Sequence, residues 1–545
     1  MAARFGFAAT GNTRSFPFAR RGSNQLTLVL LLLATVVLAP LAERLLVPYP
    51  AVLLGCGLVL ALVPGLPVPE VDPEWILPVV LPPLLFAAAR RTSWRQFLDN
   101  RRAIGLLAVA LVAVTALAVG FVVSALVPGL PLAAAVALGA AVAPPDPVAA
   151  TAVARKLGLP RRLRTILEGE GLSNDATALV LYDVAVASTL TGAFSPARAA
   201  TALGFAVVIG IAVGLVIAFA VRWLLNKLPA HPPGSALVLL MPFVAYAAAD
   251  AAHGSGVLAV VTVALGLSRY GDTESAQTRL VTGTAWEMVE LLLTGTAFAF
   301  VGLELRNVAT HVPGSLGVAI GQALAVAVVV IVIRFAWIFP VASLDERLRR
   351  RRGNDAEPVG WRELTVASWA GMRGVVTLAA VLALPVVPAS FPERDRLIFI
   401  AFVVIVVTML VQGLTLPLVV RTLGVVASQG ERDDAVRELI RRAREAGAHR
   451  LEQLRERGDV DAEVMDHAEE NAERMWHSLG FEPEGHSAQE TAQNTRHART
   501  ANAVKDELLA AARDEIVCAR GESGIDPTVV DAVLRRLDAR GTQPE

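Results

Sequence analysis

The sequence predicts an all-α, polytopic membrane protein with about thirteen transmembrane helices, and three observations support this fold class. Of the 545 residues, 54% are hydrophobic and 18% are charged. In a typical soluble domain about a quarter of the residues are charged. The charges lie mainly in short loops between apolar runs, from about Gln25 to Ser428. Many of these runs approach the roughly 20 mostly apolar residues that cross a bilayer as one helix.

The predicted crossings fill most of this apolar region, and the pattern is weakest for the pair 235–250 and 254–268. Several segments are short or contain Gly and Pro. The predicted crossings are 25–42, 50–66, 74–89, 103–127, 131–153, 166–191, 199–221, 235–250, 254–268, 284–305, 314–340, 363–384 and 397–425.

Loop charge predicts the orientation of these helices. Basic residues follow the odd-numbered crossings, as in Arg90 and Arg91, Arg161 and Arg162, and Arg349–Arg352. The positive-inside rule places such loops in the cytoplasm, so the C-terminal tail is predicted to be cytoplasmic. The N-terminal segment disagrees, because it is basic although parity places it outside. A signal peptide is the alternative for this region, but no clear cleavage site follows and a helix is predicted.

Composition divides the chain into an N-terminal segment (1–24), a transmembrane domain (25–428) and a helical tail (429–545). The tail has apolar residues at helical spacing opposite a charged face, which indicates a solvated helical region. A regulatory or dimerising role for the tail is the open alternative. The two cysteines, Cys56 and Cys518, indicate neither a disulfide framework nor a metal site. The zero formal net charge gives no indication of nucleic-acid binding, and no cofactor is expected.

Acids gather in the sixth crossing, where "EGEGLSNDATALVLYD" holds Glu168, Glu170, Asp175 and Asp183 beside Asn174. A charge at the centre of a membrane helix costs roughly 2.5–3.5 kcal/mol on insertion scales, so such residues are functional candidates. Glu168 can be explained as a helix end in the headgroup region. Asp175 cannot, because apolar and small residues follow it. Asp175 is therefore predicted to bind a proton or a Na⁺, one at a time.

Two crossings are predicted to be broken helices. Pro144, Pro145 and Pro147 surround Asp146 in the fifth, and proline removes a hydrogen-bond donor from the helix. In the twelfth, Arg373 lies in the glycine-rich stretch "GMRG". Broken helices with an acid in the break form ion sites in transporters, and crossings 4–6 and 11–13 would form an inverted repeat. A kinked helix without an ion site is the alternative for the fifth crossing.

A lone arginine, Arg334, lies inside the apolar run "ALAVAVVVIVIRFAWIFP" and needs an acidic partner. Glu170 is the predicted partner, because Asp175 must remain free to titrate. Glu170 and Asn174 are four residues apart and share one helix face.

A family resemblance appears in six motifs: "LPPLLFAAA" (81–89), "APPDPVAA" (143–150), "EGEGLSNDA" (168–176), "HGSGVLAVV" (253–261), "FVGLEL" (300–305) and "AGMRGVV" (370–376). Together they resemble the monovalent cation:proton antiporters of the CPA1 group, which includes the bacterial NhaP-type proteins and the animal Na⁺/H⁺ exchangers. The resemblance covers roughly residues 25–425 and excludes the tail.

The resemblance implies a role for each motif residue. Asp175 matches the ion- and proton-binding aspartate, with Asn174 as its partner and Asp146 as the acid of the unwound fifth helix; Ser173 joins this set. Na⁺ would be held at Asp175 and Asp146. The same resemblance implies a structural ion pair of Glu170 with Arg334, and support of the broken helices by Pro144, Pro145, Pro147 and Arg373.

Two departures from the family pattern affect the coordination shell. Pro145 replaces a threonine before the fifth-helix aspartate, and Gly171 replaces a serine after Glu170. The choice between Na⁺ and K⁺ therefore stays open. The resemblance also implies a homodimer in the plasma membrane with a mobile ion-binding core and a fixed dimerisation part.

The predicted function is antiport of Na⁺, and of Li⁺, for H⁺ by alternating access, serving pH homeostasis and sodium tolerance; K⁺/H⁺ antiport is the alternative. Asn174 stands where electrogenic cousins carry a second aspartate, which predicts electroneutral exchange. The protein is not expected to be an enzyme: "HGSG" (253–256) has a histidine where the rhomboid protease motif needs glycine. A channel is the other alternative, but it would need a continuous polar path, whereas a single acid paired with an arginine indicates alternating access.

Overall fold

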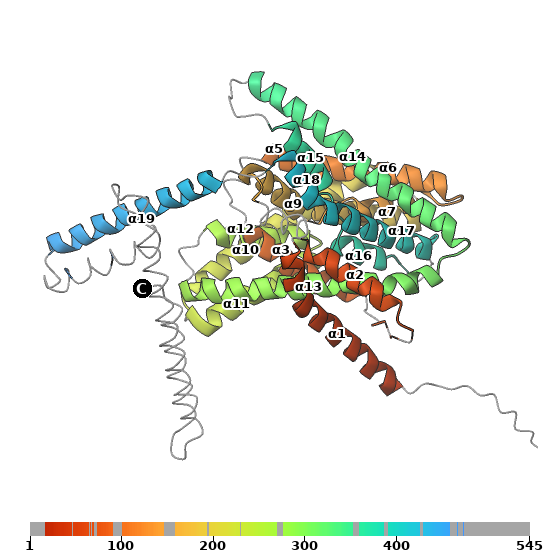
Figure 1. Cartoon of the computed structure of the whole chain (residues 1–545), viewed down its shortest axis with the longest axis horizontal. Coiled ribbons are helices and arrows are strands. Elements are labelled where there is room, and N and C mark those ends of the chain that lie inside the picture. The colour runs from red at the N-terminus through yellow and green to blue at the C-terminus, as the bar shows by residue number, and fades with distance from the viewer. Residues whose placement is uncertain are drawn as a thin grey trace, which may run out of the picture. The chain divides into compact units, whose positions relative to one another are not determined.

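The computed structural model describes residues 17–45, 47–64, 66, 68–69, 73–90, 101–146, 158–192, 196–228, 230–269, 276–351, 359–385, 391–425, 429–457, 466 and 472. All regular secondary structure within these residues is helical (Figure 1). The chain divides into two compact units, Met1–Val426 and Ala427–Glu545.

The first unit contains helices on every one of the predicted apolar segments. In chain order they are α1 (Pro17–Arg44), α2 (Tyr49–Ala61), α3 (Pro73–Arg90), α5 (Arg101–Gly105), the π-helical turn η1 (Leu106–Leu111), α6 (Val112–Leu126), α7 (Leu132–Val142), α9 (Arg161–Thr191), α10 (Pro196–Leu225), the π-helical turn η2 (Ala230–Gly234), α11 (Ser235–Ala251), α12 (Gly256–Arg269), α13 (Ala276–Thr310), α14 (Leu316–Arg351), α15 (Trp361–Trp369), α16 (Val375–Leu382), α17 (Arg394–Val407), the π-helical turn η4 (Thr408–Gln412) and α18 (Gly413–Leu423).

Seven helical segments in the described part of the chain are long and apolar enough to cross a membrane. They are Leu26–Arg44, Arg102–Leu126, Ala200–Leu225, Pro232–Ala251, Val281–Thr310, Leu316–Arg347 and Arg394–Leu423. Shorter apolar helices occupy Tyr49–Ala61, Pro78–Arg90, Leu132–Val142 and Gly256–Ser268. The helix α9, which carries the four acids, falls outside both groups. The count of thirteen crossings stays a prediction.

Several predicted boundaries were too short. Helix α13 extends past both ends of the predicted crossing 284–305, and α14 extends past the C-terminal end of 314–340, because polar and charged residues continue the helical backbone beyond the apolar stretch. The fifth crossing, predicted over 131–153, remains helical only to Val142. Residues 143–146 follow without helix, and 147–157 lie outside the described residues.

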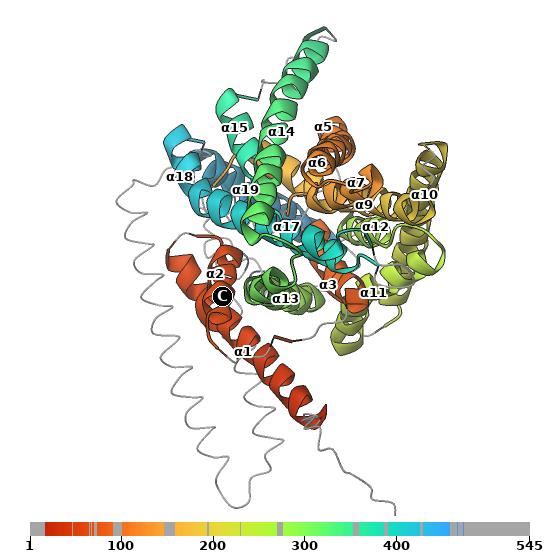
Figure 2. The same cartoon turned by 90° about the vertical axis from the view of Figure 1, so that its right-hand side faces the viewer.

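Glycines allow α2 and α13 to pack backbone against backbone (Figure 2). A Cβ added at Gly57 would overlap the Ala299 carbonyl oxygen, and one at Gly302 would overlap the Leu54 carbonyl oxygen. Small residues permit such close approach between membrane helices, where dispersion contacts replace the hydrophobic effect. Helix α13 also contacts α3, so this packing fixes its position beside the site described below.

The second unit contains α19 (Gln429–Arg457), which carries the amphipathic pattern seen in the sequence. Its polar contacts are solvent-exposed pairs, such as Arg441 with Glu445 one turn later and Arg455 with Asp466 at 3.0 Å. Exposed ion pairs contribute about 0–1 kcal/mol each, so charge pairing alone adds little to the stability of this helix.

The glycine contact yields a test of the packing. We expect Gly302→Ala to lower the thermal unfolding midpoint in detergent, because overpacking costs about 1–3 kcal/mol. Gly283→Ala on the same helix is the matched control, since nothing lies within 4 Å of a Cβ built there. Equal midpoints for the two variants would contradict the proposed backbone contact.

Candidate functional site

Two interrupted helices meet within the first unit. Helix α7 ends at Val142, while α15 ends at Trp369 and α16 begins at Val375. The unwound segments are joined by a hydrogen bond of 2.7 Å from the Asp146 backbone N–H to the Met372 carbonyl. Prolines 144 and 145 lack the N–H groups that would continue α7, so the chain leaves the helix there.

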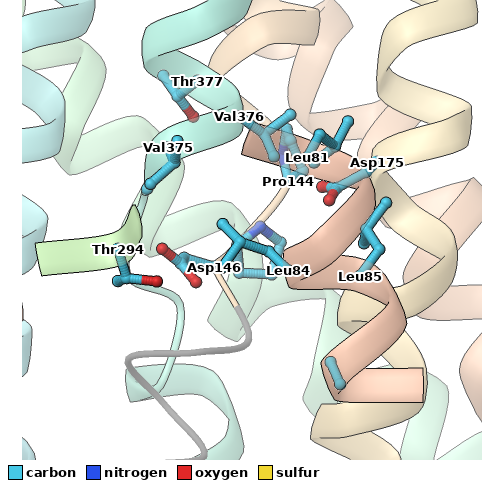
Figure 3. A pocket seen from close by; sticks show the side chains of 13 residues that line it. Leu81, Leu84, Leu85, Pro144, Asp146, Asp175, Thr294, Val375, Val376 and Thr377 are labelled. Carbon is cyan, nitrogen blue, oxygen red and sulfur yellow. The ribbon is translucent and has the colours of Figure 1, made fainter. Parts of the chain in front are cut away.

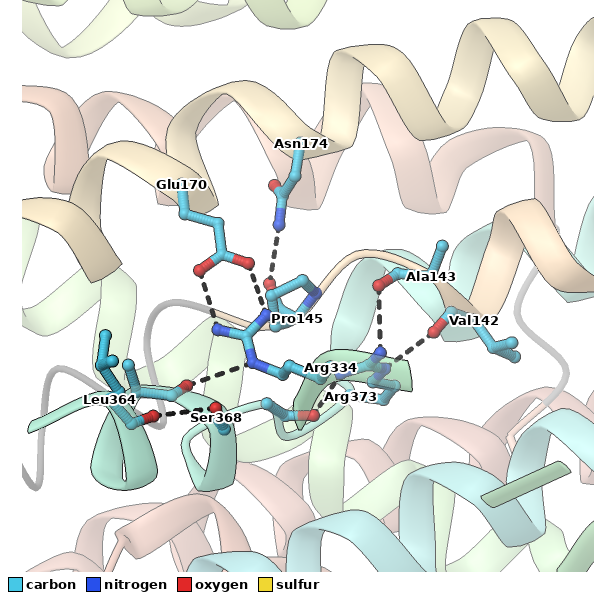
Figure 4. Close-up of polar contacts among 11 residues, drawn as sticks. Val142, Ala143, Pro145, Glu170, Asn174, Arg334, Leu364, Ser368 and Arg373 are labelled. Atoms are coloured by element: carbon cyan, nitrogen blue, oxygen red, sulfur yellow. Dashed lines mark hydrogen bonds and ion pairs between the residues drawn. The ribbon is translucent and has the colours of Figure 1, made fainter. Parts of the chain in front are cut away.

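Arg373 satisfies the backbone carbonyls that these breaks expose (Figure 4). The buried guanidinium donates from Nε to Val142 O at 2.7 Å and from Nη2 to Ala143 O at 3.1 Å. Its Nη1 donates to the carbonyl of Gly371. The last carbonyls of a helix have no internal partners and carry partial negative charge. One cation therefore binds the C-terminal end of α7 and the segment that follows α15.

The Arg373 backbone is held as well, because its N–H donates to the hydroxyl of Thr408 at 3.2 Å. Thr408 is the first residue of η4, and its hydroxyl in turn donates to Val404 O at 2.8 Å. The π-helical turn in the last long helix thus supports the second break.

Glu170 and Arg334 form a buried, two-pronged ion pair. Arg334 Nη1 lies 2.5 Å from Glu170 Oε1, and Nη2 lies 2.8 Å from Oε2. The Arg334 Nε donates to Ala367 O in α15 at 3.1 Å. Gly371 lies between the two arginines, since a Cβ there would come within 2.6 Å of Arg334 Cδ and 3.1 Å of Arg373 Nη1. The pair joins α9 on one side to α14 and α15 on the other.

Asn174 connects α9 to the first break. Its Nδ2 donates to the Pro145 carbonyl at 3.2 Å, an acceptor that the unwound backbone makes available (Figure 4). Its Oδ1 is buried and has no hydrogen-bond partner among the described residues.

A cavity of about 30 Å³ lies between the two breaks and can hold one water molecule or an ion of similar size. Asp146 and Asp175 both line it, and Figure 3 shows them on different sides of the cavity. Asp175 is 3% exposed and makes no hydrogen bond within the described part of the chain. The Asp146 carboxylate lies against Gly374, where a Cβ would overlap it. The other lining residues are Leu81, Leu84, Leu85, Ala88, Pro144, Pro145, Thr294, Gly374, Val375, Val376 and Thr377.

The structure does not bring every predicted site residue to this cavity. Asn174, which donates to the Pro145 carbonyl, is not among the lining residues. Ser173 is half-buried and is absent from the cavity wall, because a position two residues before Asp175 points to a different side of α9. Pro147 lies outside the described residues. Among the residues that are described, no group of three or more His, Cys, Asp or Glu side chains has metal-binding geometry.

Sequence reasoning missed two polar residues of the cavity wall, Thr294 of α13 and Thr377 of α16. A threonine in an apolar helix normally bonds to its own backbone, so neither residue stands out in the sequence. For Thr377 the available signal was its position, three residues after Gly374.

Comparison with known proteins identifies the family. Residues 30–422 match the family model described as the transmembrane part of the sodium/hydrogen exchangers. The chain belongs to the sodium/hydrogen exchanger family. This exchanger is 39% identical over 403 residues to the uncharacterized Na⁺/H⁺ exchanger Rv2287 of Mycobacterium tuberculosis, covering 72% of this chain and 73% of the relative. The family resemblance seen in the sequence is thereby confirmed.

Other relatives carry more specific names. The Na⁺/H⁺ antiporter ApNhaP of Aphanothece halophytica is 31% identical over 394 residues, covering 71% of each chain. The sodium, potassium, lithium and rubidium/H⁺ antiporter of Bacillus subtilis is 31% identical over 409 residues, covering 72% of this chain and 60% of the relative. Together with the family match, these relatives show that the exchanger is an integral membrane cation/proton antiporter of the CPA1, NhaP type.

A solved structure supports the fold. The sodium proton antiporter MjNhaP1 of Methanocaldococcus jannaschii, determined at pH 8, superposes with a TM-score of 0.56 at 19% identity. The match covers 74% of the exchanger and 97% of the archaeal chain.

The buried ion pair of the exchanger generates a stability prediction. Glu170→Ala or Arg334→Ala should each cost roughly 3–5 kcal/mol, because removal of one partner leaves the other charge buried and unpaired. The double variant should recover part of the loss. The measurement is the thermal unfolding midpoint in detergent.

Glu168→Ala provides the control for this experiment on the same helix. Its pairing with Arg164, at 3.8 Å, is partly exposed and should contribute at most about 1 kcal/mol. If both buried-pair variants were as stable as Glu168→Ala, the ion pair would not hold the three helices together.

Proposed function

We propose that this exchanger trades one Na⁺ for one H⁺ by alternating access, with Asp175 as the carboxylate that binds either ion. The observation that carries the proposal is the burial of Asp175 in the cavity without a hydrogen bond among the described residues. A carboxylate removed from water needs a proton or a cation to offset its lost hydration. The two ions therefore compete for one group, which is the basis of coupled exchange.

The surroundings of the three acids support this choice of Asp175. Arg334 neutralises Glu170 through two hydrogen bonds. Asp146 lies beside Gly374, the residue that precedes α16, and the N-terminal end of a helix stabilises a negative charge. Asp175 lies within α9, away from either end, and has neither form of compensation. Asp146 would then supply a fixed charge, while Asp175 gains and loses the proton.

Asn174 supports an exchange of one proton per cation. An amide offers an oxygen ligand but does not release a proton. Its amino group donates to the Pro145 carbonyl at 3.2 Å, so Asn174 helps to hold the first break and adds no second acid beside Asp175. Asp175 would then carry the same net charge with Na⁺ as with H⁺, and the transport cycle would be electroneutral.

Sodium is the proposed substrate, with Li⁺ accepted, and the name of a relative supports it. ApNhaP, 31% identical, is named as a Na⁺/H⁺ antiporter. K⁺/H⁺ antiport is the second candidate, because the B. subtilis relative is named for potassium and rubidium as well as sodium.

The proposed architecture is thirteen crossings with inverted repeats that contain the two broken helices, assembled as a homodimer in the plasma membrane. The transmembrane domain would span 25–428 and the cytoplasmic tail 429–545, a boundary close to the division between the compact units after Val426. Residues 1–24 would form a separate N-terminal segment. We propose that the protein is a transporter and not an enzyme. Its proposed cellular roles are pH homeostasis and sodium tolerance.

Asp175→Asn should abolish Na⁺-driven proton movement while the protein still folds. An asparagine cannot hold the proton that the cation displaces. The assay uses purified protein in liposomes with an internal pH dye, challenged in turn with Na⁺, Li⁺ and K⁺. Asp183→Asn on the same helix is the control and should retain exchange, since Asp183 is absent from the cavity wall. Exchange at the wild-type rate in Asp175→Asn would contradict the assignment of Asp175 as the ion-binding carboxylate.

The proposed one-for-one stoichiometry predicts that the rate of exchange does not change with the membrane potential. Liposomes are clamped with K⁺ and valinomycin, and the initial rate of Na⁺-driven proton movement is measured with the interior negative, neutral or positive. Equal rates are expected from one-for-one exchange. Rates that follow the imposed potential would mean an unequal stoichiometry.

A further inference from the structure

Two threonine hydroxyls in the cavity wall have no hydrogen-bond partner among the described residues. Thr294 and Thr377 are both 0% exposed, and both line the cavity that Asp146 and Asp175 share. A buried polar group without a partner costs about 1–3 kcal/mol, so native structures rarely retain one without a purpose.

Threonines in other helices of the first unit follow a different pattern. Thr35, Thr262 and Thr408 each donate to the carbonyl four residues earlier, at 2.9, 2.6 and 2.8 Å. Such back-bonding is the usual way for a threonine to satisfy its hydroxyl in an apolar helix. Thr294 lies in the interior of the long helix α13, yet its hydroxyl does not bond to its own backbone.

The helix break explains the orphan hydroxyl of Thr377. Thr377 is the third residue of α16, and the carbonyl four residues earlier belongs to Arg373 in the unwound segment. That residue lies outside the helix, and the Thr377 hydroxyl makes no hydrogen bond to its carbonyl. The same break that exposes Arg373 therefore releases the Thr377 hydroxyl toward the cavity.

We propose that the Thr294 and Thr377 hydroxyls are ligands of the transported cation and set its affinity. Figure 3 shows both threonines across the cavity from Asp175, with Asp146 on the threonine side. A cation held between the two carboxylates would then receive neutral oxygens from α13 and α16. Pro145, beside Asp146, has no side-chain oxygen to offer, so this wall of the cavity otherwise lacks neutral side-chain ligands.

This assignment rests on the proposed function and adds the residues that determine cation selection. A hydroxyl supplies lone pairs without changing its charge. The threonines therefore affect how tightly Na⁺, Li⁺ or K⁺ binds, and leave the number of exchanged protons unchanged. They also connect cation binding to α13 and α16, two helices that carry neither carboxylate.

The test compares Thr294→Val and Thr377→Val with the corresponding serine variants in proteoliposomes. Valine keeps the shape and removes the hydroxyl, so the apparent KM for Na⁺ should rise about tenfold or more in each, with a smaller effect on the maximal rate. Serine restores the hydroxyl and should return the KM close to the wild-type value. Thr296→Val is the matched control: its hydroxyl is also buried without a described partner, but it is absent from the cavity wall.

Direct binding separates this inference from the proposed function. In detergent, Na⁺ should raise the thermal unfolding midpoint of wild type and of Thr296→Val, and the valine variants should need about tenfold more Na⁺ for the same rise. This readout remains informative if wild type binds Na⁺ without proton exchange, an outcome that would defeat the proposed function alone. Wild-type Na⁺ dependence in both valine variants, or serine variants as weak as valine, would overturn the ligand role.

Discussion

The whole site depends on one constraint: polar groups away from water must find partners inside the protein. Breaking a helix gives the site its oxygens, but it also exposes carbonyls that hydrocarbon cannot solvate. Arg373 meets this demand by donating to Val142, Ala143 and Gly371 at once. Asn174 does the same for Pro145. Without these donors the unwound segments would lose several kcal/mol of stability per unpaired group.

The same constraint distributes the charges. Two buried arginines lie on either side of Gly371, and only Arg334 is paired directly with an acid. Arg373 is compensated by carbonyl dipoles instead. The carboxylates divide in a parallel way, because Glu170 is matched by an arginine and Asp146 lies at the start of α16. Asp175 has neither form of compensation, and in the proposed mechanism a Na⁺ or a proton provides it.

Much of this arrangement could be predicted from the sequence because burial of charge is so costly. A lone arginine in an apolar run needs an acid, and that argument paired Arg334 with Glu170 correctly. Prolines beside Asp146 and glycines beside Arg373 predicted both breaks. Helical spacing predicted that Glu170 and Asn174 would share a face. Both side chains leave α9 on the same side, Glu170 toward Arg334 and Asn174 toward the Pro145 carbonyl (Figure 4).

The remaining features depend on the direction in which each side chain and carbonyl points in the folded chain, and the sequence does not give that direction. Sequence reasoning included Ser173, but the turn of α9 directs it away from the cavity that Asp175 lines. It missed Thr294 and Thr377, because an isolated threonine has the same appearance whether it bonds to its own helix or faces a cavity. The carbonyl partners of Arg373 were also invisible, since every residue has a carbonyl and only the fold decides which remain unpaired.

The central claim is that Na⁺ and H⁺ compete for Asp175, and proton release on cation binding tests it most directly. Purified protein in weakly buffered detergent solution receives Na⁺ at fixed ionic strength, and the released protons are counted with a pH dye. Na⁺ should release up to one proton per chain from the protonated wild-type protein and none from Asp175→Asn. Equal release from both proteins, or Na⁺ binding to wild type without any release over the pH range of transport, would contradict the account.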